Sequence, residues 1–97
     1  MQVLARIELL ATDDGGRKDP LVGPFRLNHS FEPDEFVIAQ IEQEEGQALQ
    51  PGDSAQLIVD FLPETAPANL KSGTEWRIFD GPKHLVGYGR VLEVLAP

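Results

Sequence analysis

Apolar and polar residues alternate with a period of two in several short runs of the chain. In the first run, apolar residues occupy positions 3, 5, 7 and 9, with Arg6 and Glu8 between them. Residues 55–62 alternate in the same way, and Trp76 is flanked by charged residues in a third run. Successive side chains of a strand point to opposite faces of the sheet. The pattern therefore predicts half-buried β-strands, with Trp76 in the core.

Turn-forming residues separate these runs. Residues 13–16 (DDGG) open a long connection over residues 12–24, and Pro51-Gly52 suits the two central positions of a type II turn. Two further runs of strand length lie at residues 25–31 and 84–95. The last run contains two glycines, at 87 and 89, and glycines inside a strand usually mark a bulge or a close backbone approach.

The stretch at residues 33–46 fits two interpretations. Pro33, followed by two acidic residues, is typical of a helix start. The β-branched pair Val37 and Ile38, and the two-residue spacing of Phe36 and Ile38, favour a strand instead. The local pattern leaves both alternatives open. Taken together, short runs separated by frequent turns predict an all-β barrel or sandwich.

Composition narrows the class of protein. A chain of 97 residues has room for one hydrophobic core, so residues 1–97 are expected to form a single domain. The absence of cysteine excludes disulfides, thiolate metal sites and cysteine nucleophiles. Sixteen acidic residues against eight basic ones give a net charge of −8, which disfavours nucleic acid and anionic membranes as partners. Without a leader or a long apolar run, we expect a soluble, cytoplasmic domain that does not associate with membranes.

Catalytic and cofactor motifs are missing from the sequence. The phosphate-binding loop of nucleotide hydrolases has no counterpart, so no nucleotide is expected. Asp13, Asp14 and Asp19 lack the glutamate that closes a calcium loop, and aspartates are common in turns. His29 and Ser30 are neighbours in one run, where their side chains would point to opposite faces. We therefore expect no enzyme activity, cofactor or metal, and a small hydrolase is the least favoured alternative.

Two groups of residues are candidates for binding a partner. The aromatic residues Phe79 and Tyr88 lie on faces that the pattern does not assign, and either is a candidate exposed anchor for a protein partner. Arg17, Lys18 and Arg26 are the only basic residues that cluster locally. Solvated loop charges are the alternative interpretation of that cluster.

Five motifs occur in a fixed order along the chain: residues 13–17 (DDGGR), 23–26 (GPFR), 49–53 (LQPGD), 76–78 (WRI) and 85–91 (LVGYGRV). In this order and with these gaps the sequence resembles the third domain of elongation factor Tu, over about residues 3–95. The resemblance implies a six-stranded antiparallel closed β-barrel of the translation-factor type. It also implies that residues 36–43 form a strand, and nothing in the chain resembles the factor's GTPase domain.

The resemblance further implies which residues would face a tRNA stem. Asp80 and Gly81 match that face, and Asn28 stands where the family has a glutamine. The family's Arg- and Thr-containing stretch is replaced here by an acidic one with Asp34 and Glu35. We expect a stand-alone, non-catalytic binding module that acts through an unidentified protein partner. RNA or tRNA binding inherited from the family is the alternative, and the net charge of −8 disfavours it.

Overall fold

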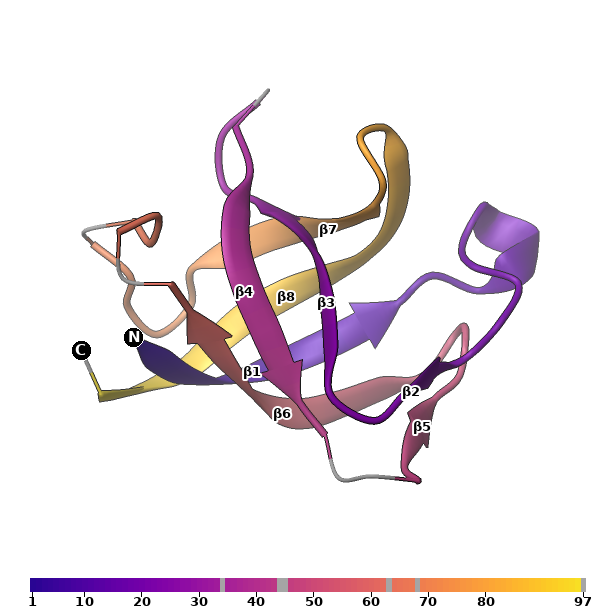
Figure 1. Ribbon diagram of the computed structural model, residues 1–97, viewed down its shortest axis with the longest axis horizontal. Helices are drawn as coiled ribbons and strands as arrows, with labels where there is room; N and C mark the ends of the chain where they lie inside the picture. The colour runs from indigo at the N-terminus through magenta and orange to yellow at the C-terminus, as the bar shows by residue number, and fades with distance from the viewer. Residues whose placement is uncertain (34, 44–45, 63, 68, 97) are drawn as a thin grey trace.

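The alternating runs of the sequence form strands in the computed structural model, which describes residues 1–33, 35–43, 46–62, 64–67 and 69–96 (Figure 1). One 3-10 helix, η1 (Thr12–Asp14), follows the first strand. The strands are β1 (Gln2–Leu9), β2 (Leu21–Val22), β3 (Phe25–Ser30), β4 (Val37–Glu42), β5 (Ala48–Leu49), β6 (Ser54–Phe61), β7 (Glu75–Asp80) and β8 (His84–Ala96).

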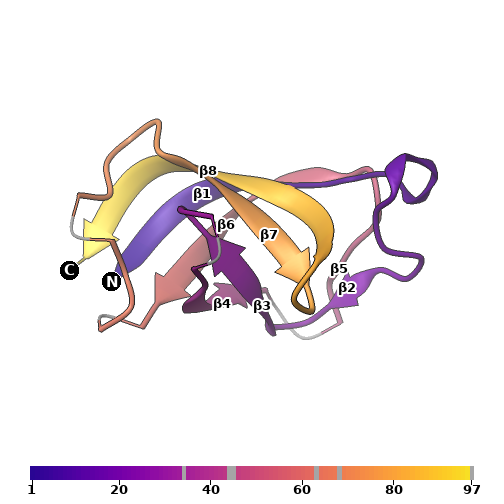
Figure 2. The ribbon, with the colours of Figure 1, turned by 90° about the horizontal axis from the view of Figure 1, so that it is seen from above.

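Six of these strands close into a barrel in the order β1-β6-β4-β3-β7-β8, and every neighbouring pair is antiparallel. Strand β1 pairs with both β6 and β8, which closes the ring. The expected six-stranded antiparallel closed barrel is confirmed. Strands β2 and β5 form a separate two-stranded ribbon, which lies with η1 at the end of the barrel away from the two chain termini (Figure 2).

The helix alternative for the stretch at residues 33–46 is wrong where the structure describes its centre, because Val37–Glu42 forms strand β4. Strand β4 pairs with β3 on one side and with β6 on the other. Its buried residues, Ala39 and Ile41, are two positions apart, as a strand with one face in the core requires. Pairing on both sides outweighs the local helix-start signal, because it satisfies the backbone groups of β4 within the sheet.

The turn predicted at Pro51-Gly52 is present. The N–H of Asp53 donates to the carbonyl of Gln50 at 3.0 Å, and Gly52 between them has a φ of 90°. A type II turn needs a positive φ at this position, which glycine adopts without steric cost. The sequence predicts one connection over residues 12–24, but Leu21–Val22 forms strand β2, which pairs with β5. It depends on the pairing of Leu21 with Leu49, which lies far along the chain.

Aromatic side chains fill one part of the barrel interior. Trp76 is only 2% exposed, as the alternation around it predicted. Its ring centroid lies 5.5 Å from that of Phe61 and 5.4 Å from that of Phe31. Its Nε1–H donates a hydrogen bond of 2.9 Å to Nδ1 of His29. We refer to these four residues as the inner aromatic cluster.

The glycines of β8 allow the close approaches that the sequence predicted. A Cβ added at Gly89 would lie 2.3 Å from the ring of Trp76, and one at Gly87 would lie 2.4 Å from the carbonyl oxygen of Glu8. Both contacts are shorter than any real Cβ contact, so the two positions have no space for a side chain. Gly89 therefore leaves space for the ring of Trp76, and Gly87 leaves space for the backbone of β1.

Candidate functional site

Strands β7 and β8 also carry aromatic residues on the outside of the barrel. Because Trp76 points inward, the alternation turns both Arg77 and Phe79 of β7 toward the outer face, and Tyr88 of β8 lies directly opposite Arg77. Phe36, just before β4, meets Phe79 edge-on, with ring centroids 5.6 Å apart. Phe36 and Tyr88 are each 42% exposed, although both are large apolar side chains.

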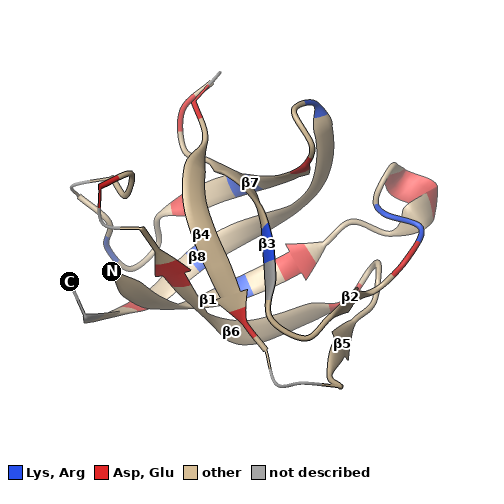
Figure 3. Ribbon diagram, viewed as in Figure 1, with Lys and Arg blue, Asp and Glu red and all other residues tan. Residues whose placement is uncertain are grey.

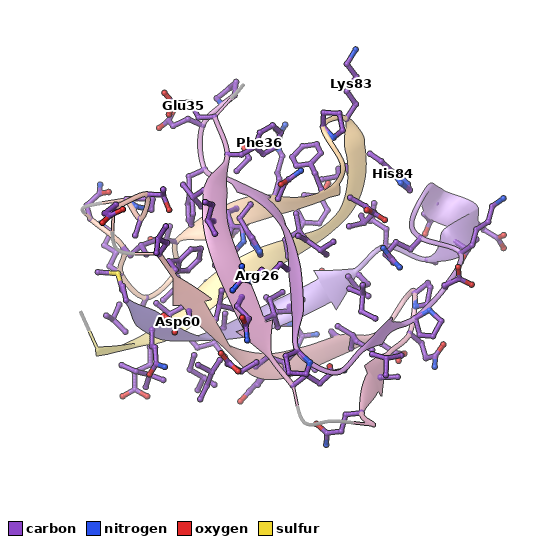
Figure 4. The ribbon with its side chains drawn as sticks, viewed as in Figure 1. Arg26, Glu35, Phe36, Asp60, Lys83 and His84 are labelled. Atoms are coloured by element: carbon purple, nitrogen blue, oxygen red, sulfur yellow. The ribbon has the colours of Figure 1, made fainter. Side chains whose placement is uncertain are left out.

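These side chains border a groove with a volume of about 430 Å³. We call it the aromatic groove and define it by five residues: Pro33, Phe36, Phe79, Pro82 and Tyr88. Figure 4 shows Phe36 between the upper end of β4 and the β7–β8 hairpin, which carries Lys83 and His84. The polar groups along the groove include the carboxylates of Glu32 and Glu75 and the guanidinium of Arg77.

A second hollow of about 340 Å³ adjoins the aromatic groove. Glu32, Glu35 and Glu75 line it, and Glu32 and Glu75 also line the groove. We call this second space the acidic hollow. Figure 3 shows the acidic segments before β4 and at the start of β7. Within the described ranges, the ion pairs join other residues, and the nearest basic position in the strand register is Arg90 of β8, directly opposite Glu75. Asp34, part of the same acidic stretch of sequence, lies outside the described residues.

The residues that match the family's tRNA face lie together. The side-chain amide of Asn28 donates to the carbonyl of Gly81 at 2.9 Å. Asp80, next to Gly81, forms an ion pair of 2.5 Å with Arg17. The three family-matched residues line a hollow of about 280 Å³ together with Arg26. Phe36 also lines this hollow.

The three candidate basic residues do not share contacts. Arg17 pairs with Asp80, and Lys18 is exposed in the loop after η1. Arg26, on β3, donates instead to the side-chain oxygen of Gln40 on β4 at 3.4 Å. Figure 3 shows the basic segment after η1 well apart from the basic position on β3, which Figure 4 labels as Arg26.

A different set of arginines comes together across strands. Arg6 of β1 lies opposite Arg90 of β8, and Arg77 of β7 lies opposite Tyr88, two residues before Arg90. Directly opposed residues have Cβ atoms about 5 Å apart, and diagonal neighbours about 7–8 Å. Sequence reasoning missed this set because its members belong to three different runs. Their outward positions were predictable, but the register between the strands was not.

The two histidines have structural contacts. His29 is fully buried, and burial lowers its pKa from 6.5 to about 4. Its Nδ1 accepts from Trp76, while Nε2 has no hydrogen-bond partner within the described structure. His84 bonds the carbonyl of Gly15 through Nε2 at 2.6 Å. In the described ranges, no three His, Asp or Glu side chains are grouped to hold a metal ion, and no helix is long and apolar enough to span a membrane.

No protein-family model matches the chain. The closed six-stranded barrel has the architecture that the resemblance to elongation factor Tu implies. One fold supports many unrelated functions, so the fold alone does not assign one. On the surface, the half-exposed aromatic residues Phe36 and Tyr88 border the aromatic groove.

Proposed function

We propose that the protein is a non-catalytic binding module, on a barrel resembling the third domain of elongation factor Tu, and that it contacts a protein partner through the aromatic groove. The observation that carries this proposal is the joint exposure of Phe36 and Tyr88, at 42% each, beside Phe79. Aromatic side chains dominate the energetics of protein interfaces, because each buries a large area at a low cost in side-chain entropy.

The chemistry of the groove supports binding rather than catalysis. Among the described lining residues, only Ser30 and Tyr88 carry a hydroxyl group. The hydroxyl of Ser30 already donates a hydrogen bond of 2.7 Å to the carbonyl of Glu32. The described lining contains no imidazole to act as a base for it. The groove offers polar and apolar surface in nearly equal shares, with Glu32, Glu75 and Arg77 among its lining residues, as in sites where one protein segment docks on another.

A cross-linking experiment tests the proposal. A photoreactive benzoylphenylalanine replaces Tyr88 or Phe36, and the protein is irradiated in an extract of its own cells. Val94, which is 39% exposed on the far part of β8, provides the matched control position. We expect protease-sensitive, ribonuclease-resistant adducts from the two groove positions only. The same adducts from Val94, or none from the groove, would contradict the proposal.

RNA binding is the second candidate function, because Asn28, Asp80 and Gly81 line one hollow together with Arg26. Affinity for RNA comes largely from basic groups that neutralise phosphates. Here Arg17 is already paired with Asp80, and the net charge is −8. We therefore expect a Kd for aminoacyl-tRNA no tighter than about 10⁻⁴ M at physiological salt, the weak end of non-specific binding.

Filter binding over a range of salt concentrations measures this affinity. A micromolar complex that weakens steeply with salt would favour RNA over protein as the partner. If Arg17→Ala or Arg26→Ala abolished that complex, the RNA would be located on the face that the resemblance implies.

A further inference from the structure

We infer that the occupant of the aromatic groove is an extended segment of the partner protein, with an apolar side chain in the groove and a Lys or Arg side chain in the acidic hollow. This inference rests on the proposed function and names the chemistry of the partner. It follows from the continuity of the two spaces, from their charges and from the geometry of β7.

The groove and the acidic hollow form one continuous surface. Phe31, Glu32 and Glu75 line both spaces, so the two spaces adjoin along these residues. Their volumes are about 430 and 340 Å³. Pockets that hold small ligands begin at about 300 Å³, so each space is large enough for one or two side chains of a partner.

The carboxylates of the acidic hollow favour a positively charged partner segment. Glu32, Glu35 and Glu75 line the acidic hollow, and its described lining contains no basic residue. None of the three forms an ion pair within the described chain. Ionised carboxylates only accept hydrogen bonds, so they are matched by the donors of Lys or Arg. An acidic segment would be repelled both by these groups and by the net charge of −8.

Strand β7 sets the spacing. Glu75 and Phe79 are four residues apart on this strand, which corresponds to about 13 Å at the rise of a β-strand. A partner segment in extended conformation covers that distance in about four residues. Arg77 lies between Glu75 and Phe79 and lines the groove, so it faces the stretch between the apolar residue and the cation. The guanidinium of Arg77 can therefore donate hydrogen bonds to backbone carbonyls of the partner segment.

Selection from a peptide library tests the inference. Random 12-residue peptides on phage are selected on the full chain and depleted on the Tyr88→Ser variant. Urea unfolding verifies that this variant is folded. We expect enrichment of peptides with an aromatic or branched apolar residue and a Lys or Arg about three to five residues away.

Synthetic copies of the enriched peptides are then measured by fluorescence anisotropy. Phe36→Ser is expected to weaken binding at least about tenfold, the effect of losing one hot-spot side chain. The double variant Glu32→Lys/Glu35→Lys is expected to weaken it about tenfold and to reverse its salt dependence. Asp13→Lys/Glu93→Lys, with the same change in net charge on exposed positions elsewhere, should stay within about twofold of the original.

The outcomes separate the two proposals. Peptides that depend on Tyr88 and Phe36 but carry acidic or no charged residues would overturn the inference and leave the docking function standing. Selection of no peptide that depends on the groove would contradict the docking function itself. Bulk tRNA that displaces the peptide at physiological salt would show an RNA site instead and would overturn both.

Discussion

Aromatic side chains form two groups on opposite sides of β7. Inside the barrel, Trp76 packs against Phe31 and Phe61 with ring centroids less than 6 Å apart and donates its N–H to His29. Outside, Phe79 meets Phe36 edge-on, and the groove beside them is open. Trp76 is buried, whereas Phe36 and Tyr88 are 42% exposed, and Phe31 and Trp76 of the inner group also line the groove.

This difference indicates which side chains stabilise the fold and which are available to bind a partner. A buried aromatic side chain gains its contacts on folding and stabilises the barrel. A half-exposed aromatic side chain keeps much of its apolar area in contact with water. It can bury that area when a partner binds. Substitution of Trp76 should therefore change mainly the free energy of unfolding, and substitutions of Phe36 and Tyr88 should change mainly binding. The following variants can break or sharpen this distinction.

Trp76→Ala should have the largest effect on stability. Removal of a buried Trp leaves a cavity and typically costs about 3–5 kcal/mol in the free energy of unfolding. It also removes the hydrogen bond that His29 accepts. Urea unfolding followed by circular dichroism measures the loss, and Trp76→Phe, which keeps part of the ring volume, should lose less. A loss as small as that of a groove variant would contradict the assignment of the inner cluster to the core.

Acid should destabilise the fold through His29. Its pKa is about 4 in the folded protein against 6.5 in the unfolded chain, so the unfolded chain binds the proton more tightly. The contribution of neutral His29 is complete above pH 6.5 and is lost as the pH falls toward 4. A shift of this size corresponds to about 3 kcal/mol, most of it lost between pH 7 and 4.5.

The measurement compares urea midpoints at pH 7 and 4.5 for three proteins. In His29→Gln the amide oxygen still accepts from Trp76 without titrating, so part of the acid sensitivity should disappear. His84→Gln is the matched control, because the ring of His84 is exposed, and it should behave as the original chain does. Equal acid sensitivity in all three would mean that the carboxylates alone cause it.

Gly89→Ala should cost about 2 kcal/mol, within the range for overpacking of a core. The new Cβ meets the six-membered ring of Trp76 at 2.3 Å. In a Trp76→Phe background that ring is gone, so the same substitution should cost much less. Additive losses in the double variant would show that contact with the Trp76 ring is not the cause of the loss at Gly89.

Tyr88→Ser and Phe36→Ser should have the smallest effects on stability. Substitutions of exposed side chains usually change the free energy of unfolding by about 0.5 kcal/mol or less, and these half-exposed rings should cost below about 1 kcal/mol. Urea midpoints near that of the original chain would sharpen the comparison with Trp76. A loss of several kcal/mol from either would mean that the outer aromatics belong to the core.

Local pattern was sufficient for the long strands. The alternation around Trp76 and over residues 3–9 places one face of each strand inward, and both faces are as predicted. The same kind of information failed at residues 33–46, where a helix start and a strand pattern compete. That choice was made by β3 and β6, which pair with β4 from either side.

The candidate site was only partly predictable. Tyr88 and Phe79 were candidate anchors, and the family-matched residues Asn28 and Gly81 do contact each other. The roles of Phe36 and Glu75 in lining the groove had no signal in the sequence. Neither residue belongs to a motif, and each becomes part of a surface only through its neighbours in space.

By itself, the sequence determined an all-β chain with one core and an acidic surface, because alternation, turn residues and charge are properties of neighbouring positions. Only the tertiary structure decided that Arg6 faces Arg90, that Leu21 pairs with Leu49 and that Phe36 meets Phe79. Each of these pairs joins distant parts of the chain. Such contacts depend on the order and register of strands in the closed barrel, and a pattern of period two is the same in every register that keeps the apolar face inside.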